Sequence, residues 1–287
     1  MGLKEKIEEV AEGLEGTLGV AVQHIGTGEE VLINGDDFFP LASALKVPVL
    51  ITLYRQVDEG KISLDEKLVM TEDAKVPGSG ILQHLTPGLE MVVRDYVTLM
   101  MMISDNTATV MVVDLVGREN INETMRRLGL ETNIMVSRER FHGKVRRSSQ
   151  DREPQLVNMM TPRGMMALLE KLYRGEAAYR SSCDDIINLM KRCQTGENRL
   201  RKYLPRDEVE VAEKTGTMAI RKKGASAVAH KPGIVYAAVI DVGIVFPKER
   251  DPYIVCGFGK ELSENDDGEE AIATVSKLVY EHFTSET

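Results

Sequence analysis

The sequence predicts an α/β protein in which the two ends of the chain build one sheet and the middle forms a helical domain. Three observations support this fold class. Strand-like runs lie near the start of the chain, apolar residues recur at helical spacing through the middle, and the last third returns to strands. We therefore expect a discontinuous sheet domain of residues 1–42 and 205–287, with residues 43–204 inserted as a helical domain.

The first predicted elements are a helix and a hairpin. MGLKEKIEEVAEGL combines charges with an apolar stripe, as an amphipathic helix does. TLGVAVQHI (Thr17–Ile25) and EEVLIN (Glu29–Asn34) are typical of strands, and the Gly26-Thr27-Gly28 turn between them is a hairpin signal.

The middle of the chain is predicted to be helical from Ser43 to about Arg201. Thr161 stands at a capping position, and Pro162 follows at the first helical position, where its missing N–H costs nothing. Methionines 100–102 are expected to fill the core. The helical runs include VRDYVTLMMMISD, TATVMVVDLVG, INETMRRLGL and TPRGMMALLEKLYRG.

The last third is predicted to contain three strands and a closing helix. The strands are EVEVAEKTGT, GIVYAAVIDVGIVF and DPYIVCGFG, and the helix is EEAIATVSKLVYEHF.

The composition favours a small-molecule partner. The formal net charge is -9 with acidic and basic residues interspersed, so nucleic acid is not the expected partner. No run approaches the roughly 18 apolar residues that span a bilayer, and the first helix has no apolar signal core. From the chain as it stands we expect a cytoplasmic protein, or a periplasmic or secreted one if a leader precedes it.

The cysteines indicate neither a metal site nor a disulfide framework. Cys183, Cys193 and Cys256 form no CxxC pair and have no histidine cluster nearby. We expect reduced thiols that pack as small apolar groups, with a Cys183–Cys193 disulfide as the alternative in an exported protein. No metal or organic cofactor is implied.

Three short fragments carry the chemistry. They are Ser43-Ala44-Leu45-Lys46, Ser104-Asp105-Asn106 and Lys214-Thr215-Gly216-Thr217. Each fragment alone is weak, because residues three apart share a helix face whatever their purpose. Together, and in this order, they form an S-x-x-K, S-D-N and K-T-G set.

This set resembles the class A serine β-lactamases and their penicillin-binding relatives. Further segments also resemble the family: VPGSGILQHL, TPGLEMVVRDYVTLMMMISDNTA, LGLET and DVGIVFP. The resemblance therefore covers roughly residues 17 to 283. It implies the β-lactamase/transpeptidase-like fold: a five-stranded antiparallel sheet with flanking helices, an inserted all-helical domain, and an active site in the cleft between them.

The resemblance implies an acyl-serine mechanism. A serine hydroxyl needs a base within hydrogen-bond reach, and Lys46 is that base for Ser43 if burial favours its neutral form. Ser104 would pass a proton to the leaving nitrogen, with Lys214 holding its hydroxyl, whereas Asp105 is expected to pin its turn. From the residues alone, Lys46 is equally an ordinary solvated charge at a helix start.

Other residues of the fragments are expected to bind the substrate. By resemblance, Asn106 holds the substrate amide carbonyl, and Thr215 and Thr217 bind its carboxylate beside Gly216. The N–H groups of Ser43 and Thr217 form an oxyanion hole, in which each donor is worth on the order of 3 kcal/mol.

The residue that activates water for deacylation is left open. DREPQLVN (Asp151–Asn158) resembles the family loop that carries a glutamate for this purpose, which points to Glu153. Glu153 lies closer to Pro162 than the family spacing allows, and counting from Leu128 points to Glu139 instead. Either glutamate is the base, or neither is.

Residues 218–240 lengthen the connection after the K-T-G fragment relative to the family. This extension is either a longer solvated hairpin or a flap that screens substrates and adds positive charge for a carboxylate. Its basic residues are Arg221, Lys222, Lys223, His230 and Lys231.

Three functions follow from the resemblance. The leading one is a class A-like β-lactamase that opens the β-lactam ring through acyl-Ser43. The alternatives are an esterase, amidase or peptidase of the same fold, and a penicillin-binding or sensor domain that is acylated without turnover. The expected partner is a β-lactam or another acyl compound bearing a carboxylate, and the sequence does not predict an oligomeric state.

Overall fold

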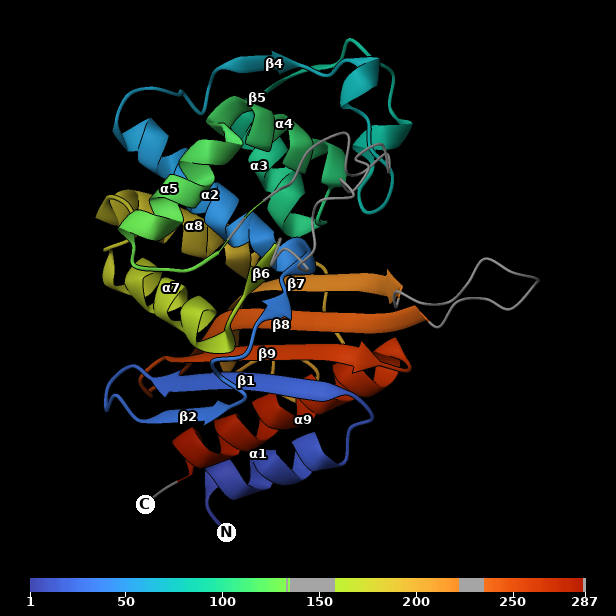
Figure 1. Cartoon of the computed structure of the whole chain (residues 1–287). Coiled ribbons are helices and arrows are strands. Elements are labelled where there is room, and N and C mark those ends of the chain that lie inside the picture. The colour runs from blue at the N-terminus through green and yellow to red at the C-terminus, as the bar shows by residue number, and fades with distance from the viewer. Residues whose placement is uncertain (133, 135–157, 222–234, 286–287) are drawn as a thin grey trace, which may run out of the picture. The chain divides into compact units, whose positions relative to one another are not determined.

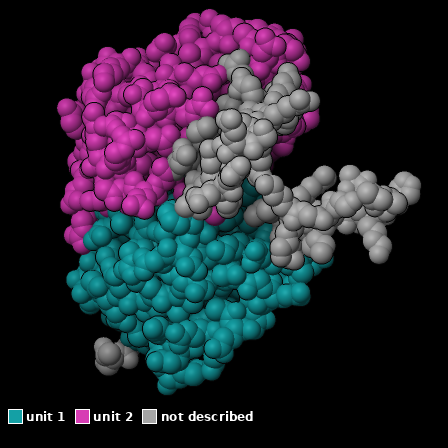
Figure 2. Space-filling view, viewed as in Figure 1, with its two compact units in different colours: residues 1–44, 160–170, 196–287 teal, residues 45–159, 171–195 magenta. Residues whose placement is uncertain are grey.

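The computed structural model describes residues 1–132, 134, 158–221 and 235–285. The chain divides into two compact units (Figure 2). The sheet unit contains residues 1–44, 160–170 and 196–287, and the helical unit contains residues 45–159 and 171–195.

The sheet unit is built on five strands in the order β2-β1-β9-β8-β7, and each neighbouring pair is antiparallel (Figure 1). This confirms the predicted five-stranded antiparallel sheet. Its elements are α1 (Leu3–Glu12), β1 (Thr17–His24), β2 (Glu30–Ile33), β7 (Val209–Arg221), β8 (Val235–Pro247), β9 (Tyr253–Leu262) and α9 (Asn265–Thr284).

Helices α1 and α9 lie side by side on one face of this sheet (Figure 1). Val20 and Val22 of β1 point into the same core as Ile272 and Val275 of α9, and all four are fully buried. Residues two apart on a strand share a face, so β-branched residues at this spacing hold the helices against the sheet.

The opposite face of β1 is also covered within this unit. A methyl group added at Gly19 would lie 2.5 Å from ring atoms of Phe39 and 2.9 Å from Pro162. Phe39 is fully buried and belongs to the short strand β3 (Phe39–Pro40), which leads to the predicted nucleophile. Strand β1 is therefore covered on both faces, and the packing of Phe39 against it fixes the segment that leads to Ser43.

The helical unit is organised around α4, which contacts α2, α3 and α5 (Figure 1). Most of α4 is buried, as its near-continuous apolar sequence predicts. Met100 and Met101 are fully buried in α3, which confirms their place in the core, whereas Met102 is only partly buried. Within the described residues, the helices that lie wholly in this unit are α2 (Lys46–Asp58), α3 (Val93–Met102), α4 (Asn106–Val116), α5 (Arg118–Arg127) and α8 (Arg180–Lys191).

The described residues also form several short elements and the helix α7. The helical unit also contains an antiparallel pair of three-residue strands. Helix α7 begins in the sheet unit and ends in the helical unit. These elements are β4 (Lys67–Val69), β5 (Glu90–Val92), β6 (Met159–Met160), α7 (Pro162–Arg174) and the 3-10 turns η1 (Ala42–Leu45), η2 (Glu72–Ala74) and η3 (Leu82–His84).

The two units differ from the predicted domains in their boundaries. Residues 43–44, 160–170 and 196–204, which the prediction gave to the helical domain, belong to the sheet unit. Arg163 explains the place of residues 160–170, since its N–H donates to the Gly35 carbonyl at 3.0 Å and its guanidinium pairs with Asp36 at 2.7 Å. Leu200 explains the place of residues 196–204, because its side chain lies in the core of the sheet unit.

Three smaller predictions concern local features. The Thr161 hydroxyl accepts a hydrogen bond from the Gly164 N–H at 3.0 Å, which confirms its capping role at α7. Cys183, Cys193 and Cys256 are buried and free, so no disulfide joins the first two. Among the described residues, no helix has both the length and the apolar character needed to cross a membrane.

Candidate active site

Ser43 lies in a strained turn of the sheet unit. The preceding residue, Ala42, has a φ of 44°, in the left-handed region that non-glycine residues rarely adopt. The Ala44 N–H donates to the Leu41 carbonyl at 2.8 Å, and the resulting 3-10 turn runs directly into α2, whose first residue is Lys46. Backbone strain of about 1–3 kcal/mol at one residue is a feature of functional sites.

Gly216 brings β7 against this turn. A methyl group added at Gly216 would lie 2.8 Å from the Leu41 carbonyl oxygen and 3.0 Å from the Ser43 backbone nitrogen. Strand β7 is the last strand of the sheet, so its outer edge is not paired within the sheet. Glycine therefore lets the backbone of the K-T-G fragment approach the backbone of Ser43.

Lys214 and Thr215 lie inside the sheet unit. Lys214 is fully buried, and its Nζ donates to the Thr215 carbonyl at 3.0 Å. Thr215 is opposite Asp241 in the β7–β8 ladder, and Thr217 is opposite Val239. Lys214 is thus enclosed by the sheet unit and does not lie in solvent.

Arg199 is a functional candidate that the sequence analysis missed. Its guanidinium donates to the Gly216 carbonyl at 3.0 Å, to the Ile240 carbonyl at 2.9 Å and to the Thr217 hydroxyl at 2.5 Å. Glu269 pairs with it at 2.8 Å. A buried guanidinium therefore contacts the Thr217 hydroxyl.

Asp241 adds a buried acid to this group. Burial raises the pKa of Asp241 from 3.8 to about 6, although the Arg199 guanidinium and the Leu200 N–H oppose the shift. Its Oδ2 accepts from the Leu200 N–H at 3.2 Å, and its Oδ1 has no hydrogen-bond partner among the described residues. A poorly solvated carboxyl group holds its proton more tightly, which is the direction of this shift.

Replacing Asp241 with asparagine is expected to flatten the pH dependence of stability. The folded-state pKa lies above the unfolded one, so the folded state binds the proton more tightly. The free energy of unfolding therefore falls as pH rises from about 4 to about 6, by up to roughly 3 kcal/mol, and is level above that window. Urea unfolding at about pH 4, 6 and 8 measures it. If the free energies of unfolding of Asp241→Asn and of the unsubstituted protein differ by the same amount at all three pH values, the raised pKa of Asp241 is contradicted.

Lys46 is the centre of the helical unit's part of the site. The side chain is 1% exposed, and its Nζ donates to the Ser104 hydroxyl at 2.8 Å and to the Ser104 carbonyl at 2.7 Å. A third bond, at 3.2 Å, goes to Oδ1 of Asn106. A lysine enclosed in this way can exchange a proton with Ser104. Its burial also excludes the alternative that Lys46 is a solvated charge at a helix start.

Asp105 holds the Ser104–Asn106 turn, as the sequence analysis expected. Its Oδ1 accepts from the Ala108 N–H at 2.9 Å and caps α4. Its Oδ2 accepts from the N–H groups of Ile81 and Leu82 at 2.7 and 2.9 Å. Three donors compensate the buried carboxylate and keep Ser104 in place at a φ of 59°.

The geometry thus consists of two groups within two units. Ser43, Gly216 and Thr217 belong to the sheet unit, and Lys46 and Ser104 belong to the helical unit. The chain itself joins them, because only two residues separate Ser43 from Lys46. Among the described residues, no cluster of His, Cys, Asp and Glu is suited to holding a metal ion.

Comparison with known proteins identifies the family. The model of the Beta-lactamase enzyme family matches residues 2–283. The chain belongs to this family. The extended-spectrum β-lactamase PER-1 of Pseudomonas aeruginosa is 28% identical over 286 residues, which cover 97% of this chain and 86% of that protein.

Solved structures of the family share the fold. A β-lactamase from Chitinophaga pinensis is 28% identical with a TM-score of 0.83, and the match covers 97% of this chain and 98% of that one. A variant of PBP-A, solved as an acyl-enzyme complex with penicillin G, is 28% identical with a TM-score of 0.78 and coverages of 98% and 95%. These likenesses confirm the predicted resemblance and fold class.

Several predicted residues of this β-lactamase-family chain lie outside the described residues. Both candidates for water activation, Glu153 and Glu139, are among them. So are Lys222, Lys223, His230 and Lys231 of the extension. Strands β7 and β8 remain paired as far as Arg221 and Val235, which is the part of the extension that the structure describes.

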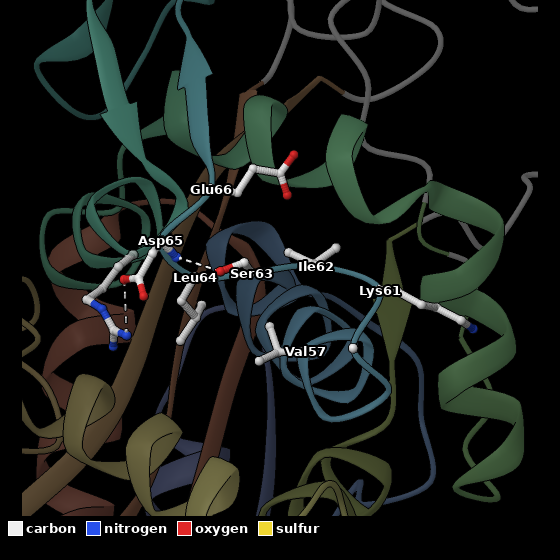
Figure 3. Close-up of a pocket in the computed structure, with 9 residues that line it drawn as sticks. Val57, Lys61, Ile62, Ser63, Leu64, Asp65 and Glu66 are labelled. Atoms are coloured by element: carbon white, nitrogen blue, oxygen red, sulfur yellow. Dashed lines mark hydrogen bonds and ion pairs between the residues drawn. The ribbon is translucent and has the colours of Figure 1, made fainter.

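A surface hollow of about 580 Å³ lies elsewhere in the helical unit (Figure 3). The residues that line it include none of the predicted site residues. Some of its polar groups pair with one another: the Asp65 N–H donates to the Ser63 hydroxyl at 3.2 Å, and the Asp65 carboxylate lies 3.8 Å from Arg94. This hollow is therefore separate from the three fragments.

Proposed function

We propose that this chain hydrolyses β-lactams through an acyl-Ser43 intermediate. The observation that carries the proposal is the buried Lys46, bonded to the Ser104 hydroxyl at 2.8 Å and placed one turn beyond Ser43. Membership of the β-lactamase family and the names of its relatives support the substrate class.

In the proposed acylation, the Ser43 hydroxyl attacks the β-lactam carbonyl carbon and gives its proton to Lys46. The N–H groups of Ser43 and Thr217 stabilise the negative oxygen that develops. The ring C–N bond then breaks, and Ser104 delivers a proton to the nitrogen while Lys46 replaces the proton on Ser104. The products of this half-reaction are an ester at Ser43 and an opened ring with an N–H group.

Substrate binding is assigned to both units. The Nδ2 group of Asn106 donates one N–H to Pro77, and its second N–H has no acceptor among the described residues, so it suits a substrate amide carbonyl. Thr215 and Thr217 are proposed to bind the substrate carboxylate. The buried charges of Lys214 and Arg199 favour an anion there.

Deacylation requires water to attack the Ser43 ester, with a base to take its proton. Glu153 and Glu139 remain the candidates. If Glu153 is the base, Glu153→Gln leaves acylation intact and traps the ester, and the same logic applies to Glu139→Gln. Turnover that survives both substitutions excludes both glutamates.

The second candidate function is a penicillin-binding protein that is acylated without turnover. The observation that favours it is the similarity to PBP-A, a variant of which was solved as an acyl-enzyme complex with penicillin G. The two functions share acylation and differ only in whether water clears the ester.

The intact mass of the protein in excess benzylpenicillin, followed over time, separates these functions. A β-lactamase is expected to show an adduct that clears as penicillin is consumed, whereas a penicillin-binding protein keeps it. Ser43→Ala is the control and is expected to form no adduct. If the unsubstituted protein forms no adduct and also consumes no penicillin, the proposal is wrong and an ester or peptide substrate takes its place.

A further inference from the structure

The backbone from Pro77 to Leu82 lies directly against the Ser104–Asn106 turn. The Asn106 N–H donates to the Ser79 carbonyl at 2.9 Å, and the Asn106 side-chain amide donates to the Pro77 carbonyl at 3.1 Å. From the other side, the N–H groups of Ile81 and Leu82 donate to Asp105. We call residues 77–82 the bracing segment.

Two glycines allow this close contact. A methyl group added at Gly78 would lie 2.4 Å from Nδ2 of Asn106, and one added at Gly80 would lie 2.2 Å from the Asp105 carboxylate and 2.4 Å from its Cα. Both glycines also have positive φ values, 112° and 97°. At these two glycines the bracing segment therefore packs its backbone directly against the turn. Since the Asn106 side chain donates to Pro77, we expect a shift of this segment to shift the Asn106 amide.

Gln83 holds the bracing segment in this shape. Its Nε2 donates to the Gly78 carbonyl and, at 3.3 Å, to the Gly80 carbonyl. One side chain therefore bridges two backbone carbonyls on either side of Ser79, whose own carbonyl accepts from Asn106. Glycine has the largest conformational freedom of any residue. The bridge from Gln83 therefore restricts the backbone at the two positions where it would otherwise be most flexible.

We propose that Gln83 is a positioning residue, which fixes the bracing segment and thereby aims the Asn106 amide at the substrate. Gln83 acts through Pro77 and Ser79 and not on the substrate itself. The bond from Lys46 to Oδ1 of Asn106 restrains the other end of the same amide, so its donor end depends on the bracing segment. The inference rests on the proposed function, because it assigns the aimed N–H to the acylamino carbonyl of a β-lactam.

The test uses two variants of Gln83 and one matched control. Gln83→Ala removes the bridge, and Gln83→Glu keeps the shape but lacks the N–H donors. Gln56→Ala is the control, because Gln56 also donates to a backbone carbonyl of this unit, that of Val116 at 2.8 Å. Gln56 is not part of the bracing segment.

The first measurement needs no substrate. Amide hydrogen exchange at Ile81, Leu82 and Asn106 is expected to speed up about tenfold in both Gln83 variants and to stay unchanged in Gln56→Ala. Unchanged exchange in both Gln83 variants would overturn the proposal. This result stands whether or not penicillins are substrates, so it separates a failure of this inference from a failure of the proposed function.

The second measurement compares two penicillins. For benzylpenicillin, whose acylamino carbonyl Asn106 would hold, KM is expected to rise about fivefold in both Gln83 variants, with kcat nearly unchanged. For 6-aminopenicillanic acid, which lacks that carbonyl, KM is expected to stay constant. Equal changes for both substrates, or a change in Gln56→Ala as large as in Gln83→Ala, would indicate a purely structural role and overturn the proposal.

Discussion

Lys46→Met is expected to slow acylation of Ser43 by benzylpenicillin by about a thousandfold, within the range for the loss of a general base. Methionine keeps an unbranched side chain, one atom shorter than that of lysine, but accepts no proton from the serine. It also leaves the Ser104 hydroxyl and carbonyl and Oδ1 of Asn106 without their shared donor. Unpaired buried acceptors cost about 1–3 kcal/mol, so a lower melting temperature is expected as well. Rapid-quench mass spectrometry measures the acylation rate.

Lys67→Met is the matched control for this substitution. Lys67 lies in the same unit and pairs with Glu90 at 2.8 Å, but its side chain is 66% exposed. Solvated pairs contribute little, so acylation and melting temperature should both stay close to those of the unsubstituted protein. An acylation rate in Lys46→Met within tenfold of the original would remove Lys46 from the proposed mechanism.

The sequence predicted the elements whose signals are local. The five strands follow from alternation and β-branched residues, and the start of α7 follows from Thr161 as a cap before Pro162. The pair β4–β5 was not predicted, because strands of three residues are too short to show a period. The true extent of the sheet unit was not predicted either, since contacts such as that of Arg163 with Gly35 join residues far apart in the chain.

The candidate site also divides into residues with a local sequence signal and residues placed only by long-range contacts. Lys46 and Ser104 were found because each sits in a short recognisable fragment. Arg199 was missed because nothing near it in the sequence marks it: its partners are backbone carbonyls of Gly216 and Ile240, supplied by two strands further along the chain. Long-range hydrogen bonds of this kind leave no spacing pattern, so only the fold places such a residue beside the fragments.

Gly216→Ala is expected to lower the acylation rate of Ser43 about a hundredfold, comparable to the loss of one oxyanion-hole donor. The new methyl group would lie 3.0 Å from the Ser43 nitrogen and 2.8 Å from the Leu41 carbonyl oxygen, so β7 and the Ser43 turn must separate. Both proposed oxyanion donors, the N–H groups of Ser43 and Thr217, belong to these two segments. Their separation changes the spacing at which a developing negative charge is held.

Gly243→Ala separates this effect from crowding in general. Gly243 is on β8, and a methyl group there would lie 2.8 Å from the Ala212 carbonyl oxygen and 3.2 Å from Cβ of Glu213. Overpacking costs about 1–3 kcal/mol in either variant, so both are expected to lose similar stability in urea unfolding. Only Gly216→Ala should lose acylation beyond what its stability explains. Equal losses of acylation in the two variants would mean that the rate follows stability of the sheet unit, and not the approach of β7 to Ser43.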